Sequence, residues 1–416
     1  MHTEMPLNAN LPRRLPRAPS RPAEGVTAAS GFVAAGVRCG IRRKRADLAL
    51  IVSDRPAAAA AVFTTNRVQA APILVSRENL LASGGSVRAI VVNSGNANAC
   101  TGEPGLAAAR LTVDETARLL GIPPEEVLVA STGVIGVPLP VSRLVSALPR
   151  ASKSLSPAGG AAAAEAILTT DTRIKQAVRR VRTSAGRYTV GGMAKGSGMI
   201  HPNMATTLGF VTTDAAVAPD FLHRCLNRAI DLSFHRITVD GDTSTNDMVA
   251  VLAGGASGVR VREGASDAFE EALTGVLVDL AKQVAADGEG ATKLIAVEVE
   301  GALSDEDALR VARTVAASPL VKTAVHGADA NWGRIVAAVG RSGVPLDPER
   351  LRVAFGDLEV LRPGYVSSFS EDEARRLLEQ KEVTIRVDLG QGSGRATTWT
   401  CDLTSGYVRI NAGYRT

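Results

Sequence analysis

Short apolar runs alternate with amphipathic segments along most of the chain. The runs Leu48–Val52, Ala89–Val92 and Val127–Ala130 are bounded by polar or turn residues, which is typical of buried strands. Other segments carry apolar residues at helical spacing, and those predicted as helices are Leu106–Leu120, Gly160–Leu168, Phe221–Leu232 and Ser266–Ala286. Gly121 directly follows the first of these helices and is a predicted C-cap. The alternation predicts an α/β protein in which layers of helices pack on sheets.

After about Leu294 the pattern becomes that of a smaller unit with capping signals and alternating strands. Its predicted helices each begin at a serine cap, and they are Ser304–Ala317 and Ser370–Lys381. Its predicted strands alternate apolar and polar positions, and they are Ile295–Val299, Val383–Leu389 and Thr397–Leu403. Gly390–Gly394 lies between the last two strands, where it predicts a hairpin turn. We expect a smaller α+β unit at about 295–400.

Length and composition are compatible with large buried cores. A chain of 416 residues can form two or three domains. Hydrophobic residues make up 45% but aromatic residues only 3%, so the core must consist mainly of Ala, Val, Leu and Ile. No apolar run approaches the roughly 18 residues that a membrane span requires, and we therefore expect no membrane partner.

The charge distribution argues against nucleic-acid binding. Of the net charge of +5, residues 1–22 hold +3, because four arginines there face Glu4 alone. The remainder has no basic stripe with interleaved aromatic residues, so we expect no nucleic-acid partner. The five prolines of residues 1–22 predict a disordered basic tail rather than a secretion signal. The four cysteines lie far apart and the five histidines are scattered, which indicates a cytoplasmic protein without a metal site.

The stretch Lys195–Phe210 is the first candidate for chemistry. A phosphate-binding loop is excluded because Lys195 precedes the glycines instead of following them. The simplest interpretation is a glycine-rich loop that enters a strand over Thr206–Thr213. A sharper hypothesis is that the chain is cut before a threonine, whose new α-amino group, with a pKa of about 7.7–8.0, could then activate its own hydroxyl. This chemistry permits a cut before Thr206 or before Thr207.

Two further stretches could support such a site. Ser131–Gly136 follows a predicted strand and precedes a helix that begins near Pro140, so it is either an ordinary βα turn or a source of N–H groups for an oxyanion. Asp240–Asp247 resembles part of a calcium loop but lacks the required glycine and glutamate. A turn held by side-chain hydrogen bonds is favoured there, with scaffolding of a site as the alternative.

Together these stretches resemble the ornithine acetyltransferase (glutamate N-acetyltransferase) family of arginine biosynthesis. The likeness extends from about Pro22 nearly to the last residue. The motifs that carry it are Lys44–Asp54, Asn93–Gly102, Ser131–Gly136, Thr169–Thr172, Lys195–Ala215, Ile237–Asp247, Asp287–Lys293, Ser318–Ile335 and Tyr407–Thr416. The resemblance implies sheets sandwiched between helices, as in the DmpA/ornithine acetyltransferase-like fold.

The resemblance also assigns roles to particular residues. It implies a self-catalysed cut between Ala205 and Thr206, which separates an α chain (23–205 after the tail) from a β chain (206–416). Thr206 would then be the nucleophile, and Thr132 and Gly133 would form the oxyanion hole. The positions implied to contact substrate are Thr169, Lys195, Thr206, Glu289, Asn411 and Thr416. Two residues near the nucleophile depart from the family pattern, and they are His201, where a small residue is expected, and Thr207, where methionine is common.

The implied reaction is a ping-pong transfer of the acetyl group from N2-acetylornithine to Thr206 and then to glutamate. No cofactor is expected, although acetyl-CoA is a co-substrate of some family members. The implied assembly is an α2β2 heterotetramer that acts on small molecules. Three alternatives remain open: a self-processed amidase or aminopeptidase that passes the acyl group to water, a specialised paralogue outside arginine synthesis, and an uncleaved binding protein.

Overall fold

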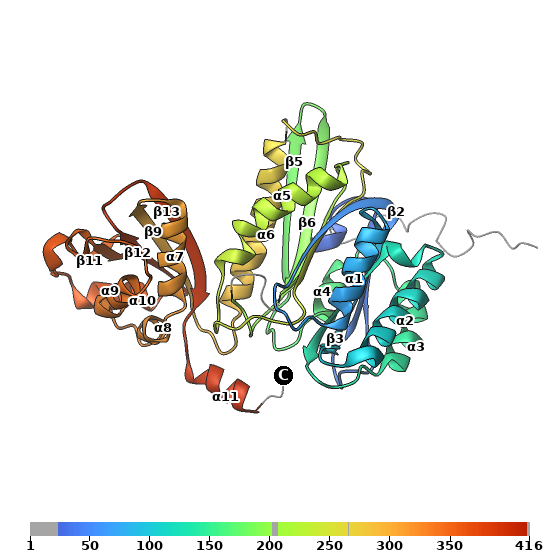
Figure 1. Cartoon of the computed structure of the whole chain (residues 1–416), viewed down its shortest axis with the longest axis horizontal. Helices are drawn as coiled ribbons and strands as arrows, with labels where there is room; N and C mark the ends of the chain where they lie inside the picture. The colour runs from blue at the N-terminus through green and yellow to red at the C-terminus, as the bar shows by residue number, and fades with distance from the viewer. Residues whose placement is uncertain (1–23, 202–206, 265, 414–416) are drawn as a thin grey trace, which may run out of the picture.

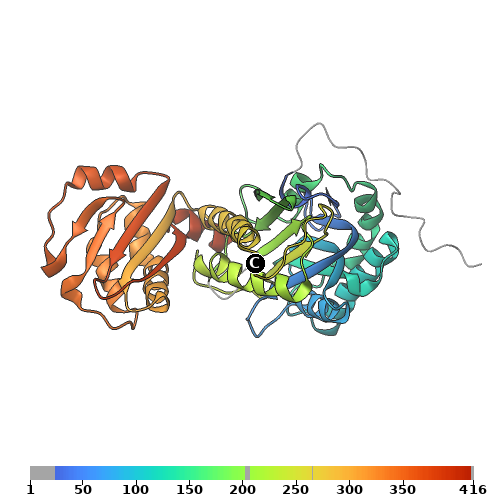
Figure 2. The ribbon, with the colours of Figure 1, turned by 90° about the horizontal axis from the view of Figure 1, so that it is seen from above.

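The computed structural model describes residues 24–201, 207–264 and 266–413. Within these ranges, an eight-stranded sheet forms the main body, and a five-stranded sheet forms a smaller lobe beside it (Figures 1 and 2). The predicted α/β class, with layered sheets and helices, is confirmed. The predicted tail at 1–22 and the positions Ala205, Thr206 and Thr416 lie outside the described residues.

The main-body sheet interleaves early and late segments of the chain. Its strands are β1 (Phe32–Val37), β2 (Leu48–Phe63), β3 (Ser86–Asn96), β4 (Val127–Val134), β5 (Lys175–Thr183), β6 (Gly186–Lys195), β7 (Leu208–Thr213) and β8 (Met248–Ala253). They are arranged in the order β4-β3-β2-β8-β7-β6-β5, and β1 pairs with β2 beside this path. The pairs β3–β4 and β7–β8 are parallel, whereas the other neighbours are antiparallel.

Helices cover both faces of this sheet. They are α1 (Ala71–Ala82), α2 (Gly102–Leu120), α3 (Val141–Lys153), α4 (Gly160–Ala166), α5 (Pro219–Asp231) and α6 (Asp267–Ala286). Because side chains alternate along a strand, Leu50 of β2 packs in the core with α2 and α3, whereas Ile51 packs on the opposite face with α4. A third core joins Leu226 of α5 and Leu277 of α6 to Val251 of β8. None of the helices in the described ranges has both the length and the apolar character needed to cross a membrane.

The smaller lobe has its own sheet and core. Its strands are β9 (Leu294–Ala302), β10 (Arg352–Phe355), β11 (Leu358–Leu361), β12 (Glu382–Asp388) and β13 (Gly394–Cys401), in the order β11-β10-β12-β9-β13. Its helices are α7 (Asp305–Ala316), α8 (Pro319–His326), α9 (Trp332–Gly340) and α10 (Glu371–Leu378). After β13, the last helix, α11 (Ser405–Gly413), leaves this lobe and returns towards the main body (Figure 1).

The predicted hairpin turn at Gly390–Gly394 is wrong. Strand β12 is parallel to β9, and β13 is antiparallel to β9 on its other side. Val299 of β9 therefore has Val387 of β12 as one neighbour and Ala396 of β13 as the other. The glycine-rich connection carries the chain past the end of β9 instead of folding it back on β12. Alternation along a strand indicates which face is buried, but it does not identify the neighbouring strand.

The caps predicted at Gly121, Ser304 and Ser370 are confirmed. The Ser304 side chain accepts the N–H of Asp307 at the start of α7, and the Ser370 side chain accepts the N–H of Glu373 at the start of α10. Gly121 ends α2 in the left-handed conformation with a φ of 66°, a region that glycine enters without steric cost. These signals depend only on residues next to one another in the chain, so they do not require the tertiary structure.

Candidate active site

A pocket in the main body gathers side chains from distant parts of the sequence. It lies where the carboxyl ends of β4 and β6, the segment before β8 and helix α11 come together. All the predicted site residues that the structure describes line it, and they are Thr132, Gly133, Thr169, Lys195, Glu289 and Asn411. The predicted positions Ala205, Thr206 and Thr416 lie outside the described residues.

Thr132 and Gly133 directly precede Val134, the last residue of strand β4, and do not form a βα turn. Strand β4 continues to Val134 and pairs with β3, and helix α3 begins only at Val141. The expected turn at Ser131–Gly136 is therefore wrong in its conformation, because parallel pairing with β3 extends the strand. The N-terminus of α3 consequently does not supply the N–H groups at these two positions.

Gly133 is required by the close approach of β3. Its φ is 133°, which side-chain-bearing residues rarely adopt. A Cβ atom at Gly133 would lie 2.3 Å from the carbonyl carbon of Gly95 and 2.5 Å from the backbone nitrogen of Asn96. Both contacts involve backbone atoms, so no side-chain rotation could relieve them. The absence of a side chain lets the backbone of Gly133 reach the pocket wall.

The segment Asp240–Asp247 scaffolds the site, which was the less favoured of the two interpretations. The side-chain amide of Asn246 donates hydrogen bonds to Ala97 O at 2.6 Å and to Ser131 O at 2.9 Å. It thereby ties the loop after β3 to the strand that carries Thr132. Asp240, Asp242, Ser244 and Asn246 also line the pocket. The sequence showed a turn here, but only the tertiary structure shows what the turn supports.

Aspartates hold the described residues on both sides of the proposed cut by accepting backbone N–H groups. Asp171 accepts the N–H of Gly196 at 2.7 Å. Asp240 accepts those of Met199 at 2.6 Å and Ile200 at 2.9 Å, although Met199 has an unfavourable φ of 59°. Beyond residues 202–206, which lie outside the described ranges, Asp247 Oδ1 accepts the N–H of Thr207 at 2.7 Å.

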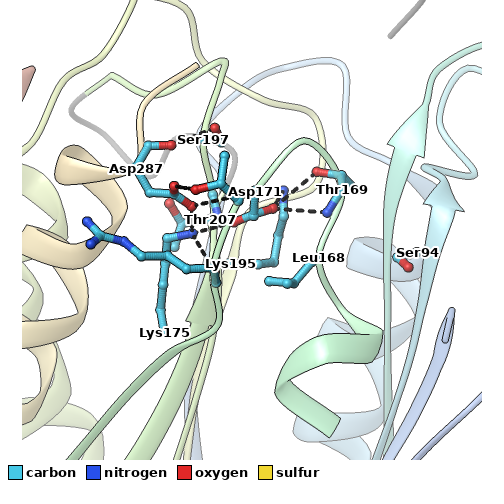
Figure 3. A network of polar contacts seen from close by, with 12 residues as sticks. Ser94, Leu168, Thr169, Asp171, Lys175, Lys195, Ser197, Thr207 and Asp287 are labelled. Carbon is cyan, nitrogen blue, oxygen red and sulfur yellow. Dashed lines mark hydrogen bonds and ion pairs between the residues drawn. The ribbon is translucent and has the colours of Figure 1, made fainter. Parts of the chain in front are cut away.

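Buried charges surround this segment (Figure 3). The Lys175 ammonium donates to Asp171 Oδ1 at 2.7 Å and to Asp287 Oδ2 at 2.6 Å, and all three side chains are nearly inaccessible to solvent. The Lys195 ammonium lies 3.9 Å from Asp171 Oδ2, which is too far for a hydrogen bond. The positive charges of Lys175 and Lys195 are thus matched by the negative charges of Asp171 and Asp287. Such pairing offsets the cost of burying each charge.

Burial and these neighbours change the ionisation of the site. Burial lowers the pKa of Lys195, against the opposing effect of the Asp171 carboxylate. Burial also raises the pKa of Asp247 well above its usual range. Burial alone would raise the pKa of Asp171. The ammonium groups of Lys195 and Lys175 have the larger combined effect and hold this pKa well below its usual range. Perturbed ionisation of this kind is typical of functional sites.

The C-terminal helix completes the pocket wall. The side-chain amide of Asn411 donates a 2.7 Å hydrogen bond to Glu289 Oε2, and the backbone N–H of Glu289 donates to Ser197 O at 3.0 Å. Tyr407, one turn before Asn411, also lines the pocket, and burial followed by the nearby carboxylate of Asp240 raises its pKa. Tyr407 was not identified as a site residue, although its motif, Tyr407–Thr416, was noted in the sequence.

An ammonium, carboxylates, hydroxyls and amides line the pocket together with apolar groups. The pocket therefore suits a small substrate with charged ends, such as an amino acid, better than an apolar ligand. Within the described ranges, no group of three or more His, Cys, Asp or Glu side chains could hold a metal ion.

The family model and the similar sequences indicate one family. The model of the ArgJ family matches residues 33–416. The arginine biosynthesis bifunctional protein ArgJ of Symbiobacterium thermophilum is 54% identical over 400 residues, which cover 95% of this chain and 99% of that protein. The protein of the same name from Chlorobaculum tepidum is 51% identical over 387 residues, covering 92% and 96%.

Two solved structures share part of the chain. The arginine biosynthesis bifunctional protein ArgJ of Bacillus halodurans is 49% identical, covers 49% of this chain and 98% of its own, and has a TM-score of 0.48. The ornithine acetyltransferase of Mycobacterium tuberculosis, solved in complex with ornithine, is 41% identical, covers 45% and 97%, and has a TM-score of 0.40.

Proposed function

This chain belongs to the ArgJ family and is an acetyltransferase of arginine biosynthesis, and we propose that it transfers acetyl groups through an acyl-enzyme on Thr206. The donor is N2-acetylornithine and the acceptor is glutamate. The observation that carries the proposal is the pocket, in which Thr132, Gly133, Thr169 and Lys195 meet Glu289 and Asn411. The family predicted from the sequence motifs is confirmed.

The nucleophile is made by cleavage of the chain. We propose that the Thr206 hydroxyl attacks the carbonyl carbon of Ala205, that the acyl group shifts from nitrogen to oxygen, and that water hydrolyses the resulting ester. Thr206 then has a free α-amino group beside its hydroxyl, and this amine can act as a general base near neutral pH. The aspartates that hold Gly196, Met199, Ile200 and Thr207 support the proposal, because they restrict the described residues on either side of the cut.

Acetyl transfer then follows in two balanced steps. Thr206 Oγ attacks the acetyl carbonyl of N-acetylornithine, its amine takes the hydroxyl proton, and this proton passes to the departing amine of ornithine. In the second step the neutral glutamate amine attacks the acetyl ester, a proton of that amine passes through the Thr206 α-amine to Thr206 Oγ, and N-acetylglutamate leaves. The Thr132 hydroxyl and the Gly133 N–H stabilise the negative oxygen in both steps, a role in which loss of one donor typically costs about 10²–10³ in rate.

The ends of the substrate match the charges of the pocket. Lys195, which is 2% exposed, provides a cation for the substrate carboxylate. Glu289 and Asn411 face the amino group at the other end, and the Thr169 hydroxyl adds a polar contact. We also propose acetyl-CoA as an alternative donor, because the similar proteins are named bifunctional. We further propose that the two chains form an α2β2 heterotetramer in the cytoplasm and need no cofactor.

Intact-mass spectrometry tests the central step. Purified protein incubated with N-acetylornithine should give two chains divided before Thr206, with an acetyl-sized increment on the later chain. Thr206→Ala should give one full-length band on a denaturing gel and no turnover. A Thr206→Ala protein that still divides would contradict the assignment, and an undivided wild-type chain would favour a binding protein of the same fold.

The acceptor distinguishes transfer from hydrolysis. Ornithine release from N-acetylornithine should depend on added glutamate and should yield acetylglutamate in equal amounts. Release that ignores glutamate and yields acetate would instead identify an amidase with the same nucleophile. Initial rates at several glutamate concentrations, with both products measured, separate the two activities.

A further inference from the structure

Asp171 accepts four hydrogen bonds beside the pocket, although it does not line it. Its Oδ1 accepts the Lys175 ammonium and the Gly196 N–H, each at 2.7 Å. Its Oδ2 accepts the Thr169 N–H at 2.9 Å and the Thr169 hydroxyl at 3.5 Å, and lies 3.9 Å from the Lys195 ammonium. In Figure 3 the carboxylate lies between Thr169 and the Lys175–Asp287 pair.

The two lysines of this cluster are held differently. Lys175 is saturated, because it donates to Asp171, to Asp287 and, at 3.4 Å, to the carbonyl of Arg173. Lys195 has no hydrogen-bond partner among the described residues at its ammonium group, and it lines the pocket. The cluster therefore satisfies one cation fully and leaves the other able to donate to a ligand.

We propose that Asp171 is a positioning residue that holds the Lys195 ammonium and the Thr169 hydroxyl in the arrangement that receives the substrate carboxylate. The proposal rests on the proposed function, because that function assigns the carboxylate to Lys195. Asp171 itself contacts no substrate. It keeps a buried lysine charged, since an ammonium without a counter-ion in such a place readily gives up its proton.

The charges around Lys195 predict the direction in which each substitution should shift its pKa. The groups that influence it are the carboxylates of Asp171, Asp247 and Glu289, which raise its pKa, and the ammonium of Lys175, which lowers it. Removing the Asp171 charge should therefore make Lys195 lose its proton at lower pH. Removing the Lys175 charge should make it lose its proton at higher pH. A purely structural disturbance would not move the two variants in opposite directions.

The test is the pH dependence of kcat/KM for N-acetylornithine, from neutral pH to about pH 11, in the cleaved enzyme. The alkaline fall of activity should move to lower pH in Asp171→Asn and to higher pH in Lys175→Met. Near neutral pH, Asp171→Asn should raise KM by about tenfold or more and change kcat by less than about threefold. Titration of the substrate amine is the same for every variant and cancels in the comparison.

Asp214→Asn is the matched control, because Asp214 is buried and accepts the N–H groups of Ser30 and Thr189 away from the pocket. It should leave the alkaline fall in place. If Asp171→Asn does not fold, Lys175→Met still decides, since an unmoved or acid-shifted fall would overturn the inference. A wild-type enzyme that does not act on N-acetylornithine would instead overturn the proposed function.

Discussion

Asn411 donates a 2.7 Å hydrogen bond to Glu289, and this bond ties the last helix of the chain to the loop that follows α6. The contact spans 122 residues of sequence and places α11 against the pocket of the main body. Helix α11 therefore belongs functionally to the main body, although it follows the smaller lobe in the chain. The first prediction concerns this contact.

Asn411→Ala should impair substrate binding and leave self-cleavage intact. Hydrogen bonds to charged groups contribute about 1.5–3 kcal/mol, and the exposure of Asn411 reduces this figure, so we expect about a tenfold fall in kcat/KM for N-acetylornithine. Steady-state kinetics and a denaturing gel measure the two effects. Arg409→Ala, on an exposed position of the same helix, should behave like the wild type. Equal losses in both variants would show that the helix acts only through its packing.

Gly133→Ala should abolish most activity, whereas Gly136→Ala should not. Both glycines have positive φ, 133° and 76°, so both variants incur a backbone strain of about 1–3 kcal/mol. Only at Gly133 would the new Cβ meet backbone atoms, at 2.3 Å, because nothing lies within 4 Å at Gly136. We expect kcat to fall by about 10² or more in Gly133→Ala alone. Similar kcat values for both variants would show that the close approach of β3 is unimportant.

Asp240→Asn should slow self-cleavage. Met199 and Ile200 donate to different oxygens of Asp240, and asparagine replaces one of these oxygens with an NH2 group that cannot accept a hydrogen bond, so one of the two contacts is lost. Met199 could then relax from its positive φ, and the segment before the cut would lose its orientation. A time course of the two bands after cell-free synthesis should show at least about a tenfold slower cut.

The control for that experiment is Asp402→Asn, since Asp402 also accepts two consecutive backbone N–H groups, those of Thr292 at 2.7 Å and Lys293 at 2.9 Å. Asp402 lies beside β9 and β13, so its replacement should leave the rate of the cut unchanged. If both variants cut at the wild-type rate, Asp240 has no role in processing.

Asp247→Asn should change the pH dependence of stability. Burial raises the folded-state pKa of Asp247 above its unfolded value, so the folded state retains a proton that the unfolded state releases. Stability from this group is complete below the unfolded pKa of about 3.9 and is lost as pH rises towards the folded pKa, by at most about 1.4 kcal/mol per pH unit. Asparagine at this position removes the loss and can still accept the N–H of Thr207.

Thermal unfolding between about pH 5 and pH 9 measures this effect, with both proteins in the Thr206→Ala background so that each is a single chain. The wild-type Asp247 protein should lose stability relative to Asp247→Asn as pH rises. A difference between the two that stays constant over this range would mean that Asp247 has the same protonation in both states.

The parts of the fold that were predicted depend on local signals. The caps at Gly121, Ser304 and Ser370 follow from residues close to them in the chain. The helices that end or begin at these caps could be predicted for the same reason. The second half of β2 was missed because the alanine run after Pro56 has no alternation of apolar and polar positions. The β5–β6 hairpin was missed as well, since exposed arginines such as Arg179 and Arg180 conceal the strand pattern.

The site could be predicted only as far as its motifs extended. The motifs indicated Thr132, Lys195 and Glu289, but they could not show that these residues face one pocket. Asp171 lay within a noted motif, yet its role depends on Gly196 and Lys175, which reach it through tertiary structure. The ionisation of the site could not be predicted from the sequence either, because the raised pKa of Asp247 results from its burial in the folded structure.

The order of strands in the main-body sheet has a consequence for the processed enzyme. Strands β7 and β8, which follow the proposed cut, lie between β2 and β6, which precede it. The two products of the cut would therefore share one sheet, with the later chain enclosed on both sides by the earlier one. Unfolding would separate two molecules, so recovery of the native state would become second order and would slow on dilution. The uncut chain could refold after unfolding, whereas the lifetime of the cleaved enzyme would be set by the rate at which it unfolds.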